Sequence, residues 1–270
     1  MPLLKKLEFN YSTILVILLI IASFLLGSLW TEIQYLQKKN TAPTVAQVAG
    51  TAQEPTQFPQ PKISLDTIKG LFEKDLIKFG DGNKKLLFVE IADPSCPYCQ
   101  AAAGKNPQLN EQMGENFKLV SDGGFYVSPV DEMRKLVNNG QASFVYIYQN
   151  GHGKGEMAMK ALYCANDQGK FWEAHDKIMS NAGYNLINND VKNDKSASGK
   201  LMDFLNDTLD PLSLQVCLES GKYDNRLAQD IQLARQLGAN GTPGFFINTN
   251  FFSGAYNWTE MKNTADANLN

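Results

Sequence analysis

The chain has 270 residues, of which 43% are hydrophobic and 20% charged, so its composition is near that of ordinary globular proteins. The 25 Lys and Arg residues nearly balance the 28 Asp and Glu residues, giving a formal net charge of -3, and the cations form no stripe. This excludes the basic footprint of nucleic-acid-binding proteins, so we expect no nucleic-acid partner. The length allows one large domain with appendages.

The N-terminal region contains an almost unbroken apolar run from Ile14 to Trp30, preceded by Lys5 and Lys6. The run is near the lower limit for a membrane-spanning helix and longer than the apolar core of a secretory signal. No small-residue cleavage pattern follows closely. We therefore predict a cytoplasmic N-terminus (1–12) and an uncleaved signal anchor (13–31), with the rest of this single-pass protein of the cell membrane outside the cytoplasm. A removed signal peptide is the alternative.

Residues 38–62 are rich in Thr, Ala, Gln and Pro and poor in aromatic and branched side chains. Such a composition buries too little apolar surface to fold, which predicts a flexible linker between the anchor and the domain. We expect the folded domain over residues 63–270. Its first helix begins after Ser64 and includes apolar residues as far as Leu76, and Gly80 ends it.

Residues 85–92 read as a central strand, because both of its alternating faces are apolar apart from Glu90. A carboxyl group in such a place has a raised proton affinity unless it is paired. Glu90 is therefore a candidate to relay a proton to or from a nearby thiol, and an ion pair at the strand edge is the other interpretation.

Two cysteines follow this strand as Cys96-Pro97-Tyr98-Cys99. Pro97 suits the first position of a helix. Because a helix N-terminus favours negative charge, a cysteine there loses its proton more easily than a free cysteine, whose pKa is about 8.5. We expect Cys96 to be the reactive thiolate and Cys99 the resolving thiol of a redox pair. A zinc site is the alternative, but it normally needs four ligands, and the sequence supplies neither a second close cysteine pair nor closely spaced histidines, so we expect no metal.

The middle of the chain combines one insertion, one strand and a helical block. Residues 105–128 are largely polar and contain glycine, which indicates an insertion beside the cysteines. A helix over residues 130–138 and a strand over residues 142–148 follow. Residues 155–238 then read as several helices separated by turns, with a solvated loop over residues 183–198.

Cys164 and Cys217 fall on two helices of this block. In an oxidising compartment they favour a structural disulfide, worth roughly 4 kcal/mol for a loop of this size in the chain-entropy model. Two buried free thiols are the alternative, because positions on helices do not establish sulfur geometry.

The end of the chain carries Gly241-Thr242-Pro243 ahead of an aromatic strand. Proline cannot donate to a strand ladder, which suits a strand entrance, and a cis bond is also compatible with this position. A second strand over residues 251–255 follows, and Asn257 with Glu260 resembles a capping box that starts a last helix.

Taken together, the Cys96–Cys99 motif after a buried strand and the distant Thr242-Pro243 resemble the DsbA-like branch of the thioredoxin superfamily over residues 63–265. Residues 168–176 and 217–224 are also similar to stretches of its secreted or membrane-tethered members. The resemblance implies an α/β thioredoxin fold with an inserted helical block (about 155–238), here preceded by a transmembrane helix.

The same resemblance implies roles for individual residues. Cys96 would form a mixed disulfide with a substrate and Cys99 would resolve it. Pro243 would be a cis-proline lying against the disulfide, and the Thr242 backbone would pair with an extended substrate that also contacts Pro97 and Tyr98. Glu90 matches the family's buried acid. Tyr98 replaces the histidine of the strongest oxidases, which removes one source of thiolate stabilisation.

We therefore expect a membrane-anchored, extracytoplasmic thiol-disulfide oxidoreductase without a cofactor that introduces disulfides into exported proteins. Its expected partners are exported proteins with cysteines and a membrane protein that reoxidises or reduces the Cys96/Cys99 pair. A reductase or an isomerase would use the same residues. A redox-inactive module that binds peptides as a chaperone is the alternative from another class.

Overall fold

The computed structural model describes residues 63–269, and every structural statement concerns this part of the chain. The predicted anchor (13–31) and linker (38–62) lie outside the described residues. Between residues 63 and 269, no helix is both long enough and apolar enough to cross a membrane.

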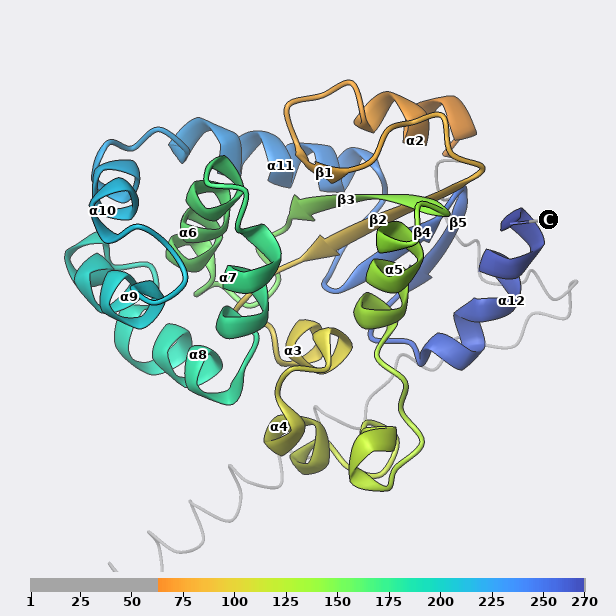
Figure 1. Cartoon of the computed structure of the whole chain (residues 1–270), viewed down its shortest axis with the longest axis horizontal. Helices are drawn as coiled ribbons and strands as arrows, with labels where there is room; N and C mark the ends of the chain where they lie inside the picture. Colours follow the sequence, from red (N-terminus) through yellow and green to blue (C-terminus); the bar gives the residue numbers. More distant parts are fainter. Residues whose placement is uncertain (1–62, 270) are drawn as a thin grey trace, which may run out of the picture. The chain divides into compact units, whose positions relative to one another are not determined.

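A five-stranded mixed sheet forms the centre of the domain, with strand order β1-β3-β2-β4-β5 (Figure 1). The strands are β1 (Ile77–Phe79), β2 (Leu86–Ala92), β3 (Ala142–Tyr148), β4 (Gly244–Ile247) and β5 (Asn250–Ser253). The central strands β2 and β3 run parallel, whereas β1, β4 and β5 each pair antiparallel with their neighbours. Such parallel neighbours need a crossover, which here contains α3, α4 and α5.

Helices cover both faces of this sheet. The α-helices are α2 (Leu65–Leu71), α3 (Pro97–Ala103), α4 (Pro107–Gln112), α5 (Pro129–Asn138), α6 (Glu156–Asp167), α7 (Phe171–Ile178), α8 (Asn181–Asn185), α9 (Ser198–Leu205), α10 (Pro211–Glu219), α11 (Asp224–Gln236) and α12 (Trp258–Leu269). Two 3-10 turns, η1 (Val120–Asp122) and η3 (Lys195–Ala197), and one π-helical turn, η2 (Leu186–Val191), complete the elements. Helices α6 to α10, which make up most of the predicted helical block, gather at one end of the sheet (Figure 1).

The β2 strand is buried on both faces, because two separate apolar clusters meet across it. Leu87, Val89 and Ile91 pack with residues of α2 and α11. Phe88 and Ala92 point to the opposite face, where they join a cluster that includes residues of α3, α5 and α6. The strand is thereby held firmly, and the residues that follow its C-terminal end start from a fixed position.

The beginning of the domain differs from the sequence prediction. Ser64 caps α2 by accepting a hydrogen bond from the Thr67 amide, as predicted, but the helix ends at Leu71 instead of continuing to Leu76. Residues 77–79 form β1, which the sequence analysis missed. The ring centroids of Phe79 and Trp172 lie 5.1 Å apart. Packing against the helical block therefore favours a strand over residues 77–79, although the spacing of the apolar residues before them is typical of a helix.

The other predicted elements agree with the structure in most places. The strands predicted over residues 85–92 and 142–148 are confirmed, and so is the start of the last helix, where the Asn257 amide donates to Glu260. The prediction of a solvated loop over residues 183–198 holds for residues 192–196, which are exposed, but not for the stretch before them. This stretch contains η2, and its Ile187 and Val191 are buried in the main core.

Candidate active site

Two cysteines stand at the corner where β2 passes into α3. Cys96 is the N-cap residue of α3, Pro97 occupies its first turn, and Cys99 lies inside that turn. Both are free thiols. Cys96 is 5% exposed whereas Cys99 is fully buried, so Cys96 is the accessible member of the pair.

The two thiols differ in their affinity for a proton. The pKa of Cys96 is lowered to about 6, chiefly by a hydrogen bond from the Cys99 side chain and further by the amides of Cys99 and Tyr98, against the opposing effect of burial. Burial, together with the neighbouring Cys96, raises the pKa of Cys99 well above its usual value. At neutral pH Cys96 is therefore a thiolate and Cys99 a thiol, which suits a nucleophile and a resolving thiol.

The turn before β4 lies against Cys96. The peptide bond between Thr242 and Pro243 is cis. The Cys96 sulfur lies 3.5 Å from the Thr242 carbonyl oxygen, although the two residues are 146 positions apart. This meeting follows from the sheet, because β4 pairs with β2 and places Gly244 opposite Ile91, near the strand end that carries the cysteines.

The loop between β3 and α6 (149–155) packs against this turn through its glycines. A Cβ atom on Gly151 would lie 1.9 Å from the Thr242 hydroxyl oxygen, and one on Gly155 would lie 1.9 Å from an Asp93 carboxyl oxygen. Only glycine fits at either position without moving its neighbour.

Asp93 ties this loop to the corner that carries Cys96, a role that the sequence analysis missed. One of its carboxyl oxygens accepts from the amide and the hydroxyl of Ser95, at 2.8 and 2.7 Å. The other accepts from the amides of Gly151 and His152, at 3.0 and 2.8 Å. The Asp93 side chain thus has four hydrogen bonds and fixes two loops that are far apart in sequence.

The helical block contacts the same corner. The Asn188 amide group of η2 donates to the Ser95 carbonyl oxygen at 3.3 Å. Gln100 of α3 donates to the carbonyl oxygens of Pro94 and Ile178, at 2.9 and 3.3 Å. The residues before Cys96 are therefore held from the side of α7 and η2 as well as from β3.

Glu90 lies in the middle of β2, fully buried between Tyr146 of β3 and Phe245 of β4 in the strand register. By strand alternation its side chain points to the face that carries α3. Neither carboxyl oxygen has a hydrogen-bond partner in the described protein, so the structure does not contain the ion pair that was the second interpretation of Glu90. Burial raises the pKa of Glu90 to about 8, so the carboxyl group holds its proton at neutral pH.

Tyr98 is the exposed residue of the cysteine motif, with 49% of its surface accessible. Its ring meets that of Phe117, from the 105–128 insertion, edge to face at a centroid distance of 5.8 Å. The insertion therefore lies beside the cysteine pair and contains α4 and η1.

Cys164 of α6 and Cys217 of α10 form a disulfide, with their Cα atoms 6.0 Å apart. Of the two interpretations of this pair, the structure contains the bonded one. The bond lies within the helical block and joins two of its helices.

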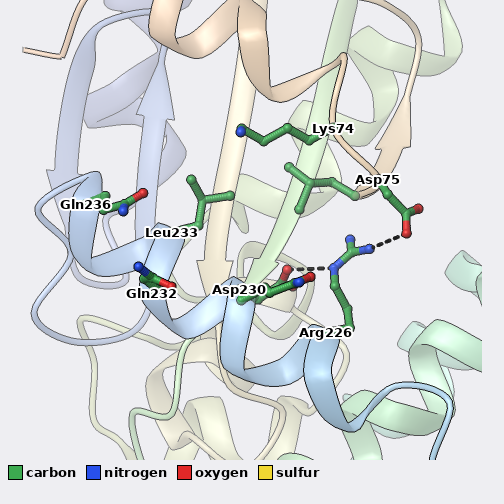
Figure 2. A pocket seen from close by; sticks show the side chains of 9 residues that line it. Lys74, Asp75, Arg226, Asp230, Gln232, Leu233 and Gln236 are labelled. Atoms are coloured by element: carbon green, nitrogen blue, oxygen red, sulfur yellow. Dashed lines mark hydrogen bonds and ion pairs between the residues drawn. The ribbon is translucent and has the colours of Figure 1, made fainter.

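A separate polar pocket of about 330 Å³ lies between α11 and the segment before β1. Figure 2 shows Arg226 joined by dashed lines to Asp230 and Asp75, at 2.7 and 3.1 Å. Arg226 is thus paired with two carboxyl groups, and Lys74 lines the same pocket. As for metals, the described residues contain no group of three or more His, Cys, Asp or Glu side chains placed to hold an ion.

Comparison with a protein-family model gives one match, to a family described as thioredoxin, over residues 126–267. This match covers more than half of the chain. It includes Pro243 but begins after the cysteine motif, which lies upstream of it.

Solved structures with a similar fold cover most of the described domain. One is a thioredoxin-like oxidoreductase from Silicibacter pomeroyi DSS-3, with a TM-score of 0.50 and 21% identity over 74% of this chain and 95% of that one. A second is oxidised BdbD from Bacillus subtilis, with a TM-score of 0.51 and 18% identity over 72% and 92% of the two chains. A third is the thiol-disulfide exchange protein alpha-DsbA2 from Wolbachia pipientis, with a TM-score of 0.50 and 16% identity over 75% and 92%. At these identities the likeness concerns the fold.

A curated relative is described as Na(+)/H(+) antiporter NhaA 3 from Salinispora tropica, 28% identical over 170 residues. The match covers 63% of this chain but only 21% of that protein, so the chain spans about a fifth of the length of this relative.

Proposed function

The chain belongs to the thioredoxin family, and from this premise we propose that it is a thiol-disulfide oxidoreductase of the DsbA type that introduces disulfides into exported proteins. The observation that carries the proposal is the asymmetric thiol pair at the start of α3, in contact with the turn at cis-Pro243. Such a pair exchanges one disulfide with another polypeptide.

The reaction starts with Cys96 and Cys99 joined in a disulfide. A substrate thiolate attacks the Cys96 sulfur, the bond between the two cysteines breaks, and the Cys99 sulfur leaves and takes up a proton. Because the Cys99 pKa lies well above its usual value, this proton is held firmly once the bond has broken. Glu90, protonated at neutral pH, is the buried acid on the same face of the sheet that supplies it.

A second substrate thiolate then attacks the substrate sulfur of the mixed disulfide. Cys96 leaves as a thiolate, for which its pKa of about 6 makes it a good leaving group. The substrate has lost two electrons and the Cys96/Cys99 pair has gained them. A membrane redox partner that removes those two electrons completes the cycle in this proposal.

The direction of transfer follows from the same asymmetry. A thiolate stabilised at Cys96 lowers the free energy of the reduced form, which makes the disulfide a stronger oxidant. The Cys164–Cys217 disulfide supports a location outside the cytoplasm, because structural disulfides persist in oxidising compartments. The anchor over residues 13–31, with the domain outside the cell membrane, remains part of the proposal.

The test is the equilibrium reduction potential of the Cys96/Cys99 pair, measured on the full chain in detergent against glutathione. We expect a value more oxidising than about -200 mV, whereas a value near the roughly -270 mV of thioredoxin would overturn the oxidase direction. A second measurement uses Cys99→Ser and an unfolded substrate whose cysteine carries a mixed disulfide with glutathione: the Cys96 thiolate attacks the substrate sulfur, glutathione leaves as the thiolate, and the protein–substrate disulfide accumulates because no Cys99 thiol resolves it. Cys96→Ser, the matched control, should accumulate none, and equal trapping by both variants would overturn the assignment of Cys96 as the nucleophile.

A further inference from the structure

Glu90 takes part in the proposed reaction from a fully enclosed position. Its side chain is completely buried, and neither carboxyl oxygen has a hydrogen-bond partner between residues 63 and 269. After it has given its proton to Cys99, Glu90 is an unpaired buried carboxylate, which is strongly unfavourable. Cys99 is fully buried as well. The reaction therefore needs a route by which a proton from the solvent reaches Glu90.

Tyr146 of β3 lies directly beside Glu90. The two residues are partners in the parallel register of β2 and β3, and neighbouring strands are about 4.8 Å apart. Both side chains point to the face of the sheet that carries α3. The Tyr146 hydroxyl group is buried and has no hydrogen-bond partner in the described domain. Burial raises the pKa of Tyr146 well above its usual value, and the charges of Glu90 and Cys99 raise it further, so the hydroxyl group keeps its proton.

His175 of α7 lies on the other side of the Tyr146 ring. The two rings meet edge to face, with their centroids 6.1 Å apart, and His175 is completely buried. Its Nδ1 atom lies 3.2 Å from the Asp176 Oδ1 atom, whereas its Nε2 atom is buried without a partner among residues 63–269. Because an imidazole can accept a proton on one nitrogen and release one from the other, His175 can connect the interior to Asp176.

Asp176 brings this series of polar groups to the surface. Its side chain is 33% exposed, and its Oδ2 atom lies 2.8 Å from Arg134 and 3.8 Å from Lys105. Buried polar groups in folded proteins normally have hydrogen-bond partners. Glu90, Tyr146 and His175 each keep a buried polar atom without one in the part of the chain that the structure describes. These groups are therefore free to hand protons to one another.

We propose that Tyr146, His175 and Asp176 form a proton path between Glu90 and the solvent, with water molecules bound between the buried groups. This inference rests on the proposed exchange function and adds three residues to it. When Cys99 leaves the disulfide with the proton of Glu90, the path returns a proton to Glu90. When the pair is reoxidised, the path removes the proton that Glu90 must lose before it can accept the one from Cys99.

The test follows reoxidation of the reduced full chain in detergent by oxidised glutathione. In the first step the Cys96 thiolate attacks one glutathione sulfur, and the other glutathione leaves as a thiolate. In the second step Cys99 gives its proton to the Glu90 carboxylate and attacks the Cys96 sulfur, and the second glutathione leaves as a thiolate. The cysteine pair loses two electrons and glutathione gains them. Rapid acid quenching and mass spectrometry measure the intermediate with glutathione on Cys96, which separates the two rates.

Tyr146→Phe removes the hydroxyl group, and His175→Gln keeps a polar side chain of similar size that does not exchange a proton readily. Proton transfer by a positioned group contributes about 10²–10⁴-fold to a rate, so each variant should slow the second step by at least about tenfold. The first step should keep its wild-type rate. In combination with Glu90→Gln, neither substitution should slow the second step further, because all three interrupt one path.

The matched control is Tyr148→Phe, on the same strand and the same face of the sheet. The Tyr148 hydroxyl group is also buried without a partner in the described residues. The pKa of Tyr148 is raised by burial and by the charges of Asp93 and Glu156, and not by Glu90 or Cys99. This variant should therefore carry out both steps at the wild-type rates.

Three results would contradict one of the two proposals. A second step at the wild-type rate in either Tyr146→Phe or His175→Gln overturns the proton path. Equal slowing of both steps also overturns it, because the two rings would then serve packing alone. If wild-type Cys99 never displaces glutathione from Cys96, the proposed exchange function itself is wrong.

Discussion

The Cys99 side chain sets the acidity of Cys96, because the hydrogen bond from the Cys99 thiol is the largest cause of the low Cys96 pKa. Cys99→Ala removes this donor, whereas Cys99→Ser keeps a hydroxyl group in its place. A hydrogen bond to a charged group is worth about 1.5–3 kcal/mol, so the alanine variant should raise the Cys96 pKa by about one to two units. The serine variant should stay closer to the wild-type value of about 6.

The measurement is the rate of Cys96 alkylation by iodoacetamide as a function of pH. A pKa near 6 in Cys99→Ala would show that the helix amides alone stabilise the thiolate. The helix N-terminus, which the sequence predicts as the source of the stabilisation, does contribute through the Cys99 and Tyr98 amides. The larger contribution of the Cys99 side chain depends on the distance between the two sulfur atoms, which no sequence pattern gives.

Glu90 links stability to pH, because its pKa of about 8 in the folded chain lies above the ordinary value of 4.5. Between these two values the folded state binds more protons than the unfolded state, so this group makes stability fall as pH rises. Glu90→Gln removes the titration. The unfolding free energy of the variant, minus that of the wild-type protein, should therefore increase by about 1.4 kcal/mol per pH unit in this window.

Urea unfolding of both proteins at pH 5, 6 and 7 measures this difference. The difference between variants is the informative quantity, because other titrating groups contribute equally to both proteins. A difference that does not change with pH would mean that Glu90 is paired or hydrated in the folded chain, and would remove it as the proton donor to Cys99.

At the scale of elements, the corner between β2 and α3 depends on Asp93. In Asp93→Asn one carboxyl oxygen becomes an NH2 group, which cannot accept either from the Ser95 pair of donors or from the Gly151 and His152 amides. Two buried donors then lose their partner, so we expect a loss of about 2–4 kcal/mol of unfolding free energy. The measurement is urea unfolding, with Ser95→Ala as the comparison.

Ser95→Ala removes only the hydroxyl group, which donates to Asp93 and accepts from the Lys154 amide. Its loss should be smaller, about 1 kcal/mol for each of these hydrogen bonds. If Asp93→Asn were no more destabilising than Ser95→Ala, the loop over residues 149–155 would not depend on the Asp93 carboxyl group.

The sequence correctly predicted those helices, strands and caps that depend only on residues close together in the chain. The buried runs of β2 and β3, the caps at Ser64 and Asn257, and the start of α3 at Pro97 all belong to this class. The features that were missed depend on contacts between distant segments. Phe79 becomes strand because it packs against the helical block, and Asp93 accepts from amides 58 and 59 residues away.

At the scale of the whole molecule, the sheet brings the two halves of the candidate site together. The thiols follow β2, Pro243 precedes β4, and these strands are neighbours, so the pairing of β2 with β4 brings the two motifs together. The sequence contained both motifs and the buried strands beside them, but not the strand order. The family resemblance supplied that arrangement, because no local pattern records which strands pair.

The helical block is closed by the Cys164–Cys217 disulfide across a sequence separation of 53 residues. In the chain-entropy model, closing a loop of this length in the unfolded state stabilises the folded chain by ~4 kcal/mol. The double variant Cys164→Ala/Cys217→Ala should therefore unfold at a lower urea concentration and lose about that much unfolding free energy. Since the bond lies between α6 and α10, the pH dependence of Cys96 alkylation should be the same in the variant and in the wild-type protein. A shifted alkylation profile with little loss of stability would instead assign the second cysteine pair to the redox chemistry of Cys96 and Cys99.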